Sequence, residues 1–167
     1  ARGAVVSGNF FDVLGVAMAA GRSFHPDEDV VPGARPVAIL SHAVWIRRYA
    51  GDSGILNRTI NINGHAFAVV GVAAPLFAGL ELDDPLPSVW IPMAMIDQIV
   101  PDFDPSWLTA DDSSWLRAVA RLAPGVSIAE EIGRGGVVGE SVHDLLSGPR
   151  SGRMCGDVKV QDSAPMV

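Results

Sequence analysis

The sequence predicts a mixed α+β fold in which most strands pair antiparallel. The expected order is strand–helix, strand–helix, hairpin, strand, loop and strand–helix–strand, with no internal repeat. Two observations carry most of this prediction. Residues 37–40 form a short, wholly apolar run that is typical of a buried strand. Asn63-Gly64 separates strand-like residues 59–62 from strand-like residues 66–72, which is the pattern of a type I′ hairpin turn.

The N-terminal part is expected to begin with a strand and a short helix. Residues 4–7 are strand-like, and Asn9 is a candidate N-cap for a helix over residues 10–14. A loop is expected from there to Gly21. Residues 26–35 are acidic and rich in turn formers, so we expect them to lie at the surface.

A second helix is expected directly after the buried strand. Ser41 is a good N-cap, and Trp45 and Tyr49 lie four residues apart on one apolar, aromatic face. Gly51 is expected to end this helix. Residues 89–91 form another short apolar run, which Pro92 closes, and we interpret it as a strand.

The C-terminal part is harder to interpret. Residues 97–114 are polar and rich in Pro and Asp, which predicts a loop, and residues 115–122 alternate like a half-buried strand. A helix is expected from Ile128, but the glycines within residues 133–139 interrupt it. Residues 157–161 are a candidate last strand.

Composition excludes several classes of function. The net charge of −7 leaves no Lys- and Arg-rich surface for nucleic acid, and it argues against direct binding to anionic lipid. The single cysteine cannot form an internal disulfide. No apolar run reaches the roughly 18 residues that span a bilayer, and no signal-peptide pattern is present. Because the chain begins without Met in strand-like residues, we interpret it as a piece of a longer protein.

No motif predicts catalysis or a cofactor. Asp102 and Asp104 are weak candidates for a calcium site, but Pro105 follows, and the glycine and terminal glutamate of a calcium loop are missing. His25 is expected to be a solvated loop residue. Trp107, in the polar loop, is the one aromatic residue that we consider a candidate for partner contact, because exposed Trp is enriched at interaction hot spots.

Several segments, in order, resemble the MacB-like periplasmic core domain of FtsX-family permeases. The similarity extends over roughly residues 4–132, and its detail is closest to the large permeases of acidobacteria. The segments that carry it are residues 6–15, 21–24, 36–41 with Trp45 and Arg48, 59–64 with 67–73, 89–92, and 121–127. The resemblance implies an extracytoplasmic domain of an inner-membrane protein. It also implies a ferredoxin-like "porter" subdomain of two βαβ halves, with an α+β "sabre" subdomain inserted between them.

The resemblance also predicts the domain organisation. Residues 1–7 would be the strand that enters the sabre, residues 8–98 the sabre-like subdomain, residues 99–112 a connecting loop, and residues 113–163 the second βαβ half of the porter. The first half would lie upstream. Since half a sheet leaves an unpaired edge and an uncovered apolar face, we expect residues 113–167 either to be less ordered or to pair with a second copy of the chain.

Three functions follow as hypotheses. The first is a non-catalytic domain of a bacterial ABC-type permease that acts in transport or efflux through mechanotransmission and partner contacts. Its partners would be the rest of the permease, a periplasmic adaptor or another extracytoplasmic protein and, only indirectly, an ATPase. The second is a binding module for a peptide, lipid or small apolar ligand in a groove. The third is a metal-dependent hydrolase, which would need the aspartates and His25 to converge.

Overall fold

The computed structural model describes residues 2–80, 86–100, 103–108 and 160–162, together with Val119, Arg121, Leu122 and Pro124. Contacts group residues 1–111 and 154–167 into one compact unit and residues 112–153 into another. The strand expected over 115–122, apart from Val119, Arg121 and Leu122, and the helix expected from Ile128 lie outside the described residues.

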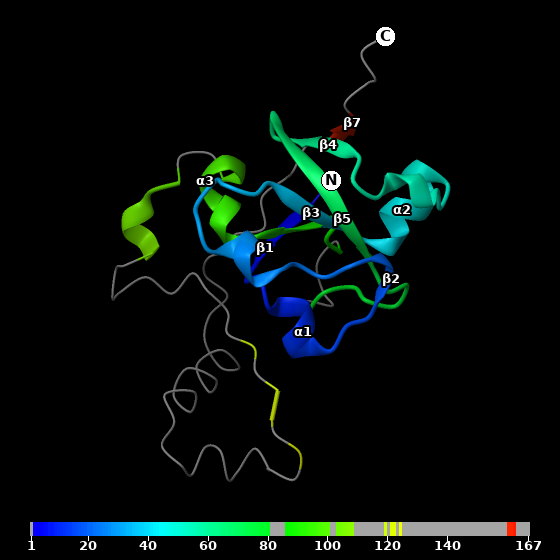
Figure 1. The fold of residues 1–167 in the computed structure, drawn as a ribbon, viewed down its shortest axis with the longest axis horizontal. Coiled ribbons are helices and arrows are strands. Elements are labelled where there is room, and N and C mark those ends of the chain that lie inside the picture. Colours follow the sequence, from blue (N-terminus) through cyan, green and yellow to red (C-terminus); the bar gives the residue numbers. More distant parts are fainter. Residues whose placement is uncertain are drawn as a thin grey trace. The chain divides into compact units, whose positions relative to one another are not determined.

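The described strands form one mixed sheet (Figure 1). Its order is β1-β6-β3-β5-β4-β7, and β2 pairs with the end of β5. Four of the six strand pairings are antiparallel, while β1–β6 and β3–β5 are parallel, so the predicted mixed and mostly antiparallel α+β class is confirmed. The strands are β1 (Gly3–Val6), β2 (Met18–Gly21), β3 (Val37–Leu40), β4 (Thr59–Ile62), β5 (His65–Ala73), β6 (Val89–Pro92) and β7 (Val160–Asp162).

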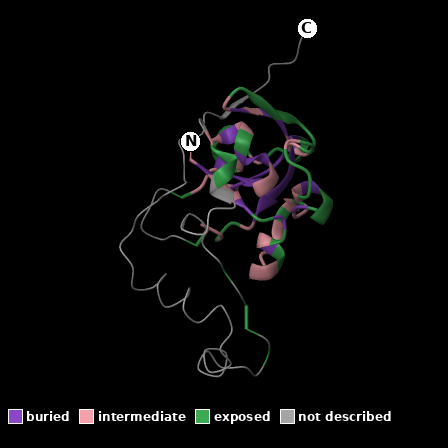
Figure 2. Cartoon of the chain, turned by 90° about the vertical axis from the view of Figure 1, so that its left-hand side faces the viewer, coloured by how far each residue is buried: buried purple, intermediate pink, exposed green. Residues whose placement is uncertain are grey.

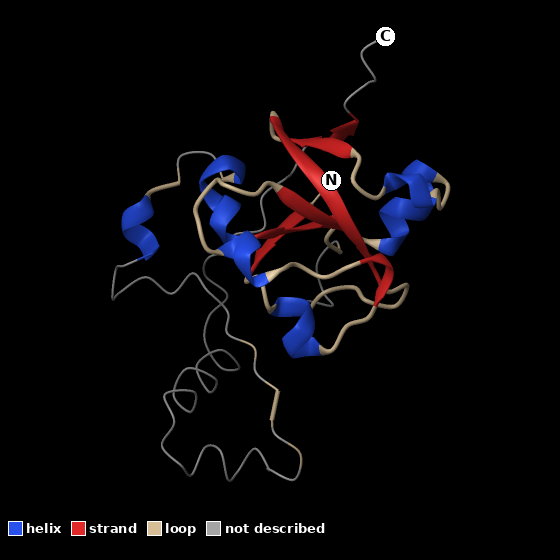
Figure 3. Ribbon diagram, viewed as in Figure 1, coloured by secondary structure: helices blue, strands red, loops and turns tan. Residues whose placement is uncertain are grey.

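Short helices occupy the connections between the strands (Figure 3). The α-helices are α1 (Phe10–Leu14), α2 (His42–Tyr49) and α3 (Ile96–Ile99), and the 3-10 helices are η1 (Pro26–Asp29), η2 (Ser53–Ile55), η3 (Met93–Met95) and η4 (Pro105–Leu108). Because α3 and η4 lie within or overlap residues 97–114, the prediction of an unbroken loop there is wrong in part.

The β4–β5 hairpin has the predicted turn. Asn63 and Gly64 both have positive φ, at 52° and 94°, as a type I′ turn requires. The side-chain oxygen of Asn61 accepts the amide of Gly64 at 2.9 Å, and the side-chain amide of Asn63 donates to the carbonyl of Ile99 at 2.8 Å. The turn is therefore tied both to its own strand and to the end of α3.

The predicted cap of α2 is also present. The hydroxyl of Ser41 accepts the amide of Val44 at 3.2 Å, which satisfies one of the free donors at the start of the helix. The helix ends at Tyr49, and Ala50 takes the left-handed conformation with φ of 51° before Gly51 at 73°. The chain thus leaves α2 one residue before the glycine that was expected to stop it.

Two hydrophobic clusters, one on each face, flank the sheet, because successive strand residues point to opposite sides. In β6, Val89 and Ile91 belong to one cluster and Trp90 to the other. Figure 2 shows that buried residues concentrate in the strands. We call the first the aliphatic cluster: Ala38, Leu40, Val44, Tyr49, Ile55, Ile60, Ile62, Phe67, Val69, Val72, Val89, Ile91, Met95 and Ile99. The aromatic cluster comprises Val6, Phe11, Phe24, Val37, Ile39, Val70, Ala73 and Trp90.

The loop predicted between α1 and residue 21 is instead partly a strand. β2 pairs antiparallel with β5, with Gly21 opposite Gly71 and a register shift between Met18 and Ala20. Residues 18–21 lack the alternating pattern of a strand. They form one because their backbone pairs with that of β5. A side chain at Gly71 would collide with the carbonyl of Arg22, so glycine is required where the two backbones meet.

Asn9 stands at the predicted N-cap position of α1, but it does not act as a cap through its side chain. α1 does begin after Asn9, but the side chain makes no cap hydrogen bond. The backbone of Asn9 has φ −93° and ψ 5°, outside the extended conformation that N-caps adopt, and its side-chain oxygen accepts the hydroxyl of Ser7 at 2.8 Å.

The predicted last strand, residues 157–161, overlaps β7. Its partner is β4, with Ile62 opposite Val160 and Ile60 opposite Asp162. The boundaries of the sabre-like and porter-like subdomains stay predictions, as does self-pairing of the chain.

Candidate functional site

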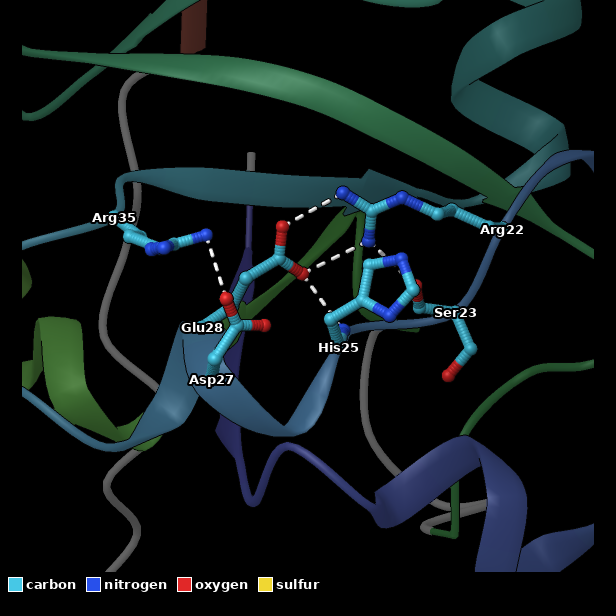
Figure 4. Close-up of polar contacts among 6 residues, drawn as sticks. All are labelled: Arg22, Ser23, His25, Asp27, Glu28 and Arg35. Carbon is cyan, nitrogen blue, oxygen red and sulfur yellow. Dashed lines mark hydrogen bonds and ion pairs between the residues drawn. The ribbon is translucent and has the colours of Figure 1, made fainter.

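An ion pair between a partly exposed arginine and a buried carboxylate holds the turn between β2 and η1 (Figure 4). Glu28 is only 5% exposed, although it lies in the stretch predicted for the surface. Arg22 holds both carboxylate oxygens, with Nη2 to Oε1 at 2.7 Å and Nη1 to Oε2 at 2.9 Å. The backbone amide of His25 adds a third hydrogen bond, at 2.7 Å. The surface prediction is wrong at this residue because Arg22 supplies the paired charge that makes burial of a carboxylate tolerable.

The electrostatics of this pair favour its charged form. Burial by itself would raise the pKa of Glu28, but the hydrogen bonds from Arg22 and His25 and the charge of Arg22 outweigh it, so the pKa is lowered. The pKa of Arg22 is raised, chiefly by its hydrogen bond to Glu28. The pair therefore stays ionised at neutral pH and stabilises the turn between β2 and η1.

Asp29, the next residue, ties three segments together. Its Oδ2 accepts the amide of Gly8 at 2.7 Å, in the turn before α1, and its Oδ1 accepts the amide of Ala94 at 2.8 Å, in η3. A Cβ at Gly8 would lie 2.8 Å from the Cβ of Asp29, so only glycine allows this approach. We call Arg22, Glu28 and Asp29, with the groups they bind, the polar anchor.

Beside the polar anchor is a small, open hollow, lined by Ser7, Gly8, Asn9, Asp12, Pro26 and Asp29. Both oxygens of Asp29 are already engaged by backbone amides. Within the described ranges, no three His, Cys, Asp or Glu side chains come close enough to hold a metal ion. The arrangement is thus suited to bracing the backbone.

Of the three predicted site residues, only Asp104 has a described side chain. Asp104 is exposed and accepts the amide of Ser106 at 2.9 Å, and that hydrogen bond lowers its pKa. Trp107 lies in η4, but its side chain is outside the described part, as is all of Asp102. The weak calcium site and the partner contact of Trp107 therefore stay predictions. His25 is exposed, as expected, and contributes to the polar anchor through its backbone.

Sequence reasoning missed the polar anchor for a specific reason. Three acids, Asp27, Glu28 and Asp29, follow one another, and nothing local shows which of them turns inward. Asp27 pairs with Arg35 at 2.7 Å, with both side chains more than half exposed. The usable signal was an arginine placed shortly before a Pro-initiated acidic turn.

These elements define a mixed α+β domain with a hydrophobic cluster on each face of its sheet. The family of MacB-like periplasmic core domains matches residues 1–132, which is most of the chain. The chain belongs to this family, as its motifs predicted, and it is an extracytoplasmic domain of an ABC transporter permease. No curated protein matches the sequence.

A solved structure supports the fold. The chain is similar to the periplasmic region of MacB from Actinobacillus actinomycetemcomitans, with a TM-score of 0.50 and 16% identity. The match covers 93% of this chain and 58% of that one, so this chain spans a little more than half of its relative. Among the described residues, none of the helices is both long and apolar enough to cross a membrane.

Proposed function

We propose that this domain acts in transport or efflux without catalysing a reaction. It transmits motion between the membrane part of its parent permease and an extracytoplasmic partner, such as a periplasmic adaptor. Any ATPase would be coupled only indirectly. Membership of the family of MacB-like periplasmic core domains supports this proposal.

The observation that carries the proposal is the position of the first and last described strands. β1 and β7 lie at opposite ends of the strand order β1-β6-β3-β5-β4-β7. β1 is paired along its whole length with β6, from Gly3–Val89 to Val6–Pro92. A displacement applied to either strand must therefore pass through the hydrogen-bonded sheet, which resists stretching and shear as one body.

The polar anchor supports the same role. Asp29 joins the turn after β1 to the turn after β6, through Gly8 and Ala94. Two parallel neighbours in the sheet are thus fastened at their carboxyl ends as well as along their ladder. Such cross-ties limit internal movement, which a body that passes on motion requires.

The test measures distances in the complete permease by electron paramagnetic resonance. In a Cys155→Ser background, spin labels at Arg47→Cys in α2 and Asp97→Cys in α3 report distances within the domain, since both positions are exposed. A second label pair joins position 47 to a membrane helix. We expect the first distance to stay constant between nucleotide-free and nucleotide-bound states, while the second changes.

Two results would count against the proposal. A change in the distance between positions 47 and 97 on addition of a ligand would favour a binding module that closes around a peptide, lipid or small apolar molecule. If neither distance responds to nucleotide, the domain does not transmit motion.

A further inference from the structure

The connection between η1 and β3 leaves two adjacent valines in water. Val30 is 70% exposed and Val31 is 56% exposed, although valine is among the residues most often buried in folded proteins. We call residues 30–34 the valine loop. Isolated apolar residues on a surface are ordinary, so the case for a contact surface depends on how this loop is held and on what surrounds it.

Hydrogen bonds fix the valine loop to the rest of the domain. Directly before it, Asp29 accepts the amides of Gly8 and Ala94. Within it, the amide of Gly33 donates to the carbonyl of Ala94 at 2.8 Å, and the side-chain amide of Gln98 donates to the carbonyl of Gly33 at 3.4 Å. Figure 1 shows the loop running beside α3. The loop therefore has little conformational entropy to lose when a partner covers the valines.

A turn inside the valine loop fixes its backbone further. The amide of Ala34 donates to the carbonyl of Val31 at 3.2 Å, and Gly33 has a positive φ of 70°. With Pro32 in the second position and glycine in the third, residues 31–34 have the pattern of a type II turn. Because proline has a fixed φ and glycine adopts a positive φ without strain, the turn presents Val31 in a defined conformation.

The small hollow beside the polar anchor adjoins the valine loop, because Asp29 lines the hollow and directly precedes Val30. Asp12, on another side of the hollow, is exposed. Within the described residues, its carboxylate makes no hydrogen bond or ion pair. A Lys or Arg side chain that entered the hollow would thus meet the carboxylate of Asp12 without displacing a partner from it.

Charge indicates what would cover this surface. Asp12 and Asp29 both line the hollow, and the only groups that bind the carboxylate of Asp29 among the described residues are neutral backbone amides. Arg22 and Arg35, which flank this segment in the sequence, are already paired with acids of η1 (Figure 4). An apolar surface beside uncompensated negative charge fits a partner whose apolar contact area is bordered by positive charge. Anionic lipid would be repelled.

We propose that the valine loop and the adjoining hollow are the docking site for a second extracytoplasmic protein, which presents an apolar segment with a Lys or Arg side chain beside it. The valines contact the apolar segment, and the hollow receives the cationic group next to Asp12. This inference rests on the proposed function, and it assigns the partner contact of that function to the connection between η1 and β3.

Photocrosslinking in intact cells tests the proposal. A benzophenone amino acid replaces Val31 in the complete permease. The matched control replaces Leu76, which is 97% exposed in the loop between β5 and β6 and so tests whether exposure alone produces crosslinks. We expect position 31 alone to crosslink to a second protein, and mass spectrometry should map the crosslink to an apolar segment next to Lys or Arg.

Binding of the purified permease to the crosslinked protein then separates the two contributions. We expect Val30→Ser with Val31→Ser to weaken affinity about tenfold or more, and Leu76→Ser to leave it unchanged. Asp12→Asn should weaken binding less and reduce its dependence on salt. Asp12→Lys should weaken it further, and replacing the mapped Lys or Arg of the partner by Glu should restore it. An unchanged affinity for the double serine variant would overturn the proposal.

Other outcomes would also overturn it. Crosslinks from position 31 to lipid, with co-sedimentation on vesicles of phosphatidylethanolamine and phosphatidylglycerol that the double serine variant abolishes, would make the loop a membrane contact. Crosslinks to a second copy of the chain, to a protein surface bordered by acids, equally from position 76, or from neither position would exclude the proposed partner site. The double serine variant should keep the spin-label distances of the wild type, so failure here leaves mechanotransmission separately testable.

Discussion

The two faces of the sheet are built differently. The aliphatic cluster contains Val44 of α2 and Ile62 of the hairpin, and each of these elements has its own local signal in the sequence. The aromatic cluster unites Phe11, Phe24 and Trp90, which come from three separate connections or strands. Only Trp90 of these lies in a predicted strand.

This difference shows which elements are specified by neighbouring residues and which depend on contacts between residues distant in the sequence. On the aliphatic face, a helix cap and a hairpin turn are each specified by neighbouring residues. On the aromatic face, the loops are positioned by contacts between rings that are distant in sequence and by the bonds of Asp29 to Gly8 and Ala94.

The largest expected effect comes from the centre of the aromatic cluster. Trp90 is 1% exposed, and Trp90→Ala should lower the free energy of unfolding by about 3–5 kcal/mol, as measured by urea denaturation followed by circular dichroism. Leu40 lies on the aliphatic face and is 0% exposed, and Leu40→Ala should lower the free energy of unfolding by a similar amount, about 2–5 kcal/mol.

If Trp90→Ala does not fold, Trp90→Phe provides a milder version of the same test. Comparable losses on the two faces would mean that both are part of one cooperative core. A loss below about 1 kcal/mol for Trp90→Ala would show that the aromatic face contributes little to stability.

The next largest effect concerns the polar anchor. Arg22→Ala leaves the buried carboxylate of Glu28 without its paired charge, which should cost about 1–3 kcal/mol. The figure lies below that of a fully buried pair because Arg22 is itself 41% exposed and solvent screens it. Asp27→Asn, in the exposed pair with Arg35, is the matched control and should change stability by less than about 0.5 kcal/mol.

The polar anchor also predicts a dependence on pH. Because the pKa of Glu28 is lowered in the folded state, its ionisation stabilises the fold above the ordinary carboxyl pKa, and this contribution is lost as pH falls through the lowered value. The difference in unfolding free energy between wild type and Glu28→Gln should therefore be full near neutral pH and shrink in acid. A difference independent of pH would contradict the assigned ion pair.

A smaller effect separates a real helix cap from an apparent one. Ser41→Ala removes the hydroxyl that accepts the amide of Val44 and should cost about 1 kcal/mol. Asn9→Ala should cost less, because Asn9 stands at the cap position of α1 without a cap hydrogen bond. Thermal unfolding of the two variants measures the contrast, and equal losses would refute it.

The smallest effect is expected at Leu76, in the loop between β5 and β6. Leu76→Ser should change the free energy of unfolding by less than about 0.5 kcal/mol, because the side chain is almost wholly in water. Phe77→Ala, its neighbour, should cost about 2 kcal/mol or more, since the ring packs on Phe11 and Trp90. Urea denaturation of both variants tests whether the loop presents Leu76 from an anchored base.

The sequence by itself determined the fold class, the wholly apolar strand β3, the capped helix α2 and the β4–β5 hairpin. These features depend on the conformational preferences of neighbouring residues, such as Ser41 at a helix start and Asn63-Gly64 in a left-handed turn. The order of several such motifs was also enough to indicate the family, which the comparison confirms.

Only the tertiary structure decided the pairing of β2 with β5, the partner of β7, and the inward turn of Glu28 among three consecutive acids. Each depends on a partner that lies elsewhere in the chain or is chosen among equivalent neighbours, so no local pattern contains the information. A segment without alternating apolar residues, such as β2, can form a strand when a neighbouring strand pairs with its backbone. A carboxylate becomes buried when an arginine and backbone amides together replace its water.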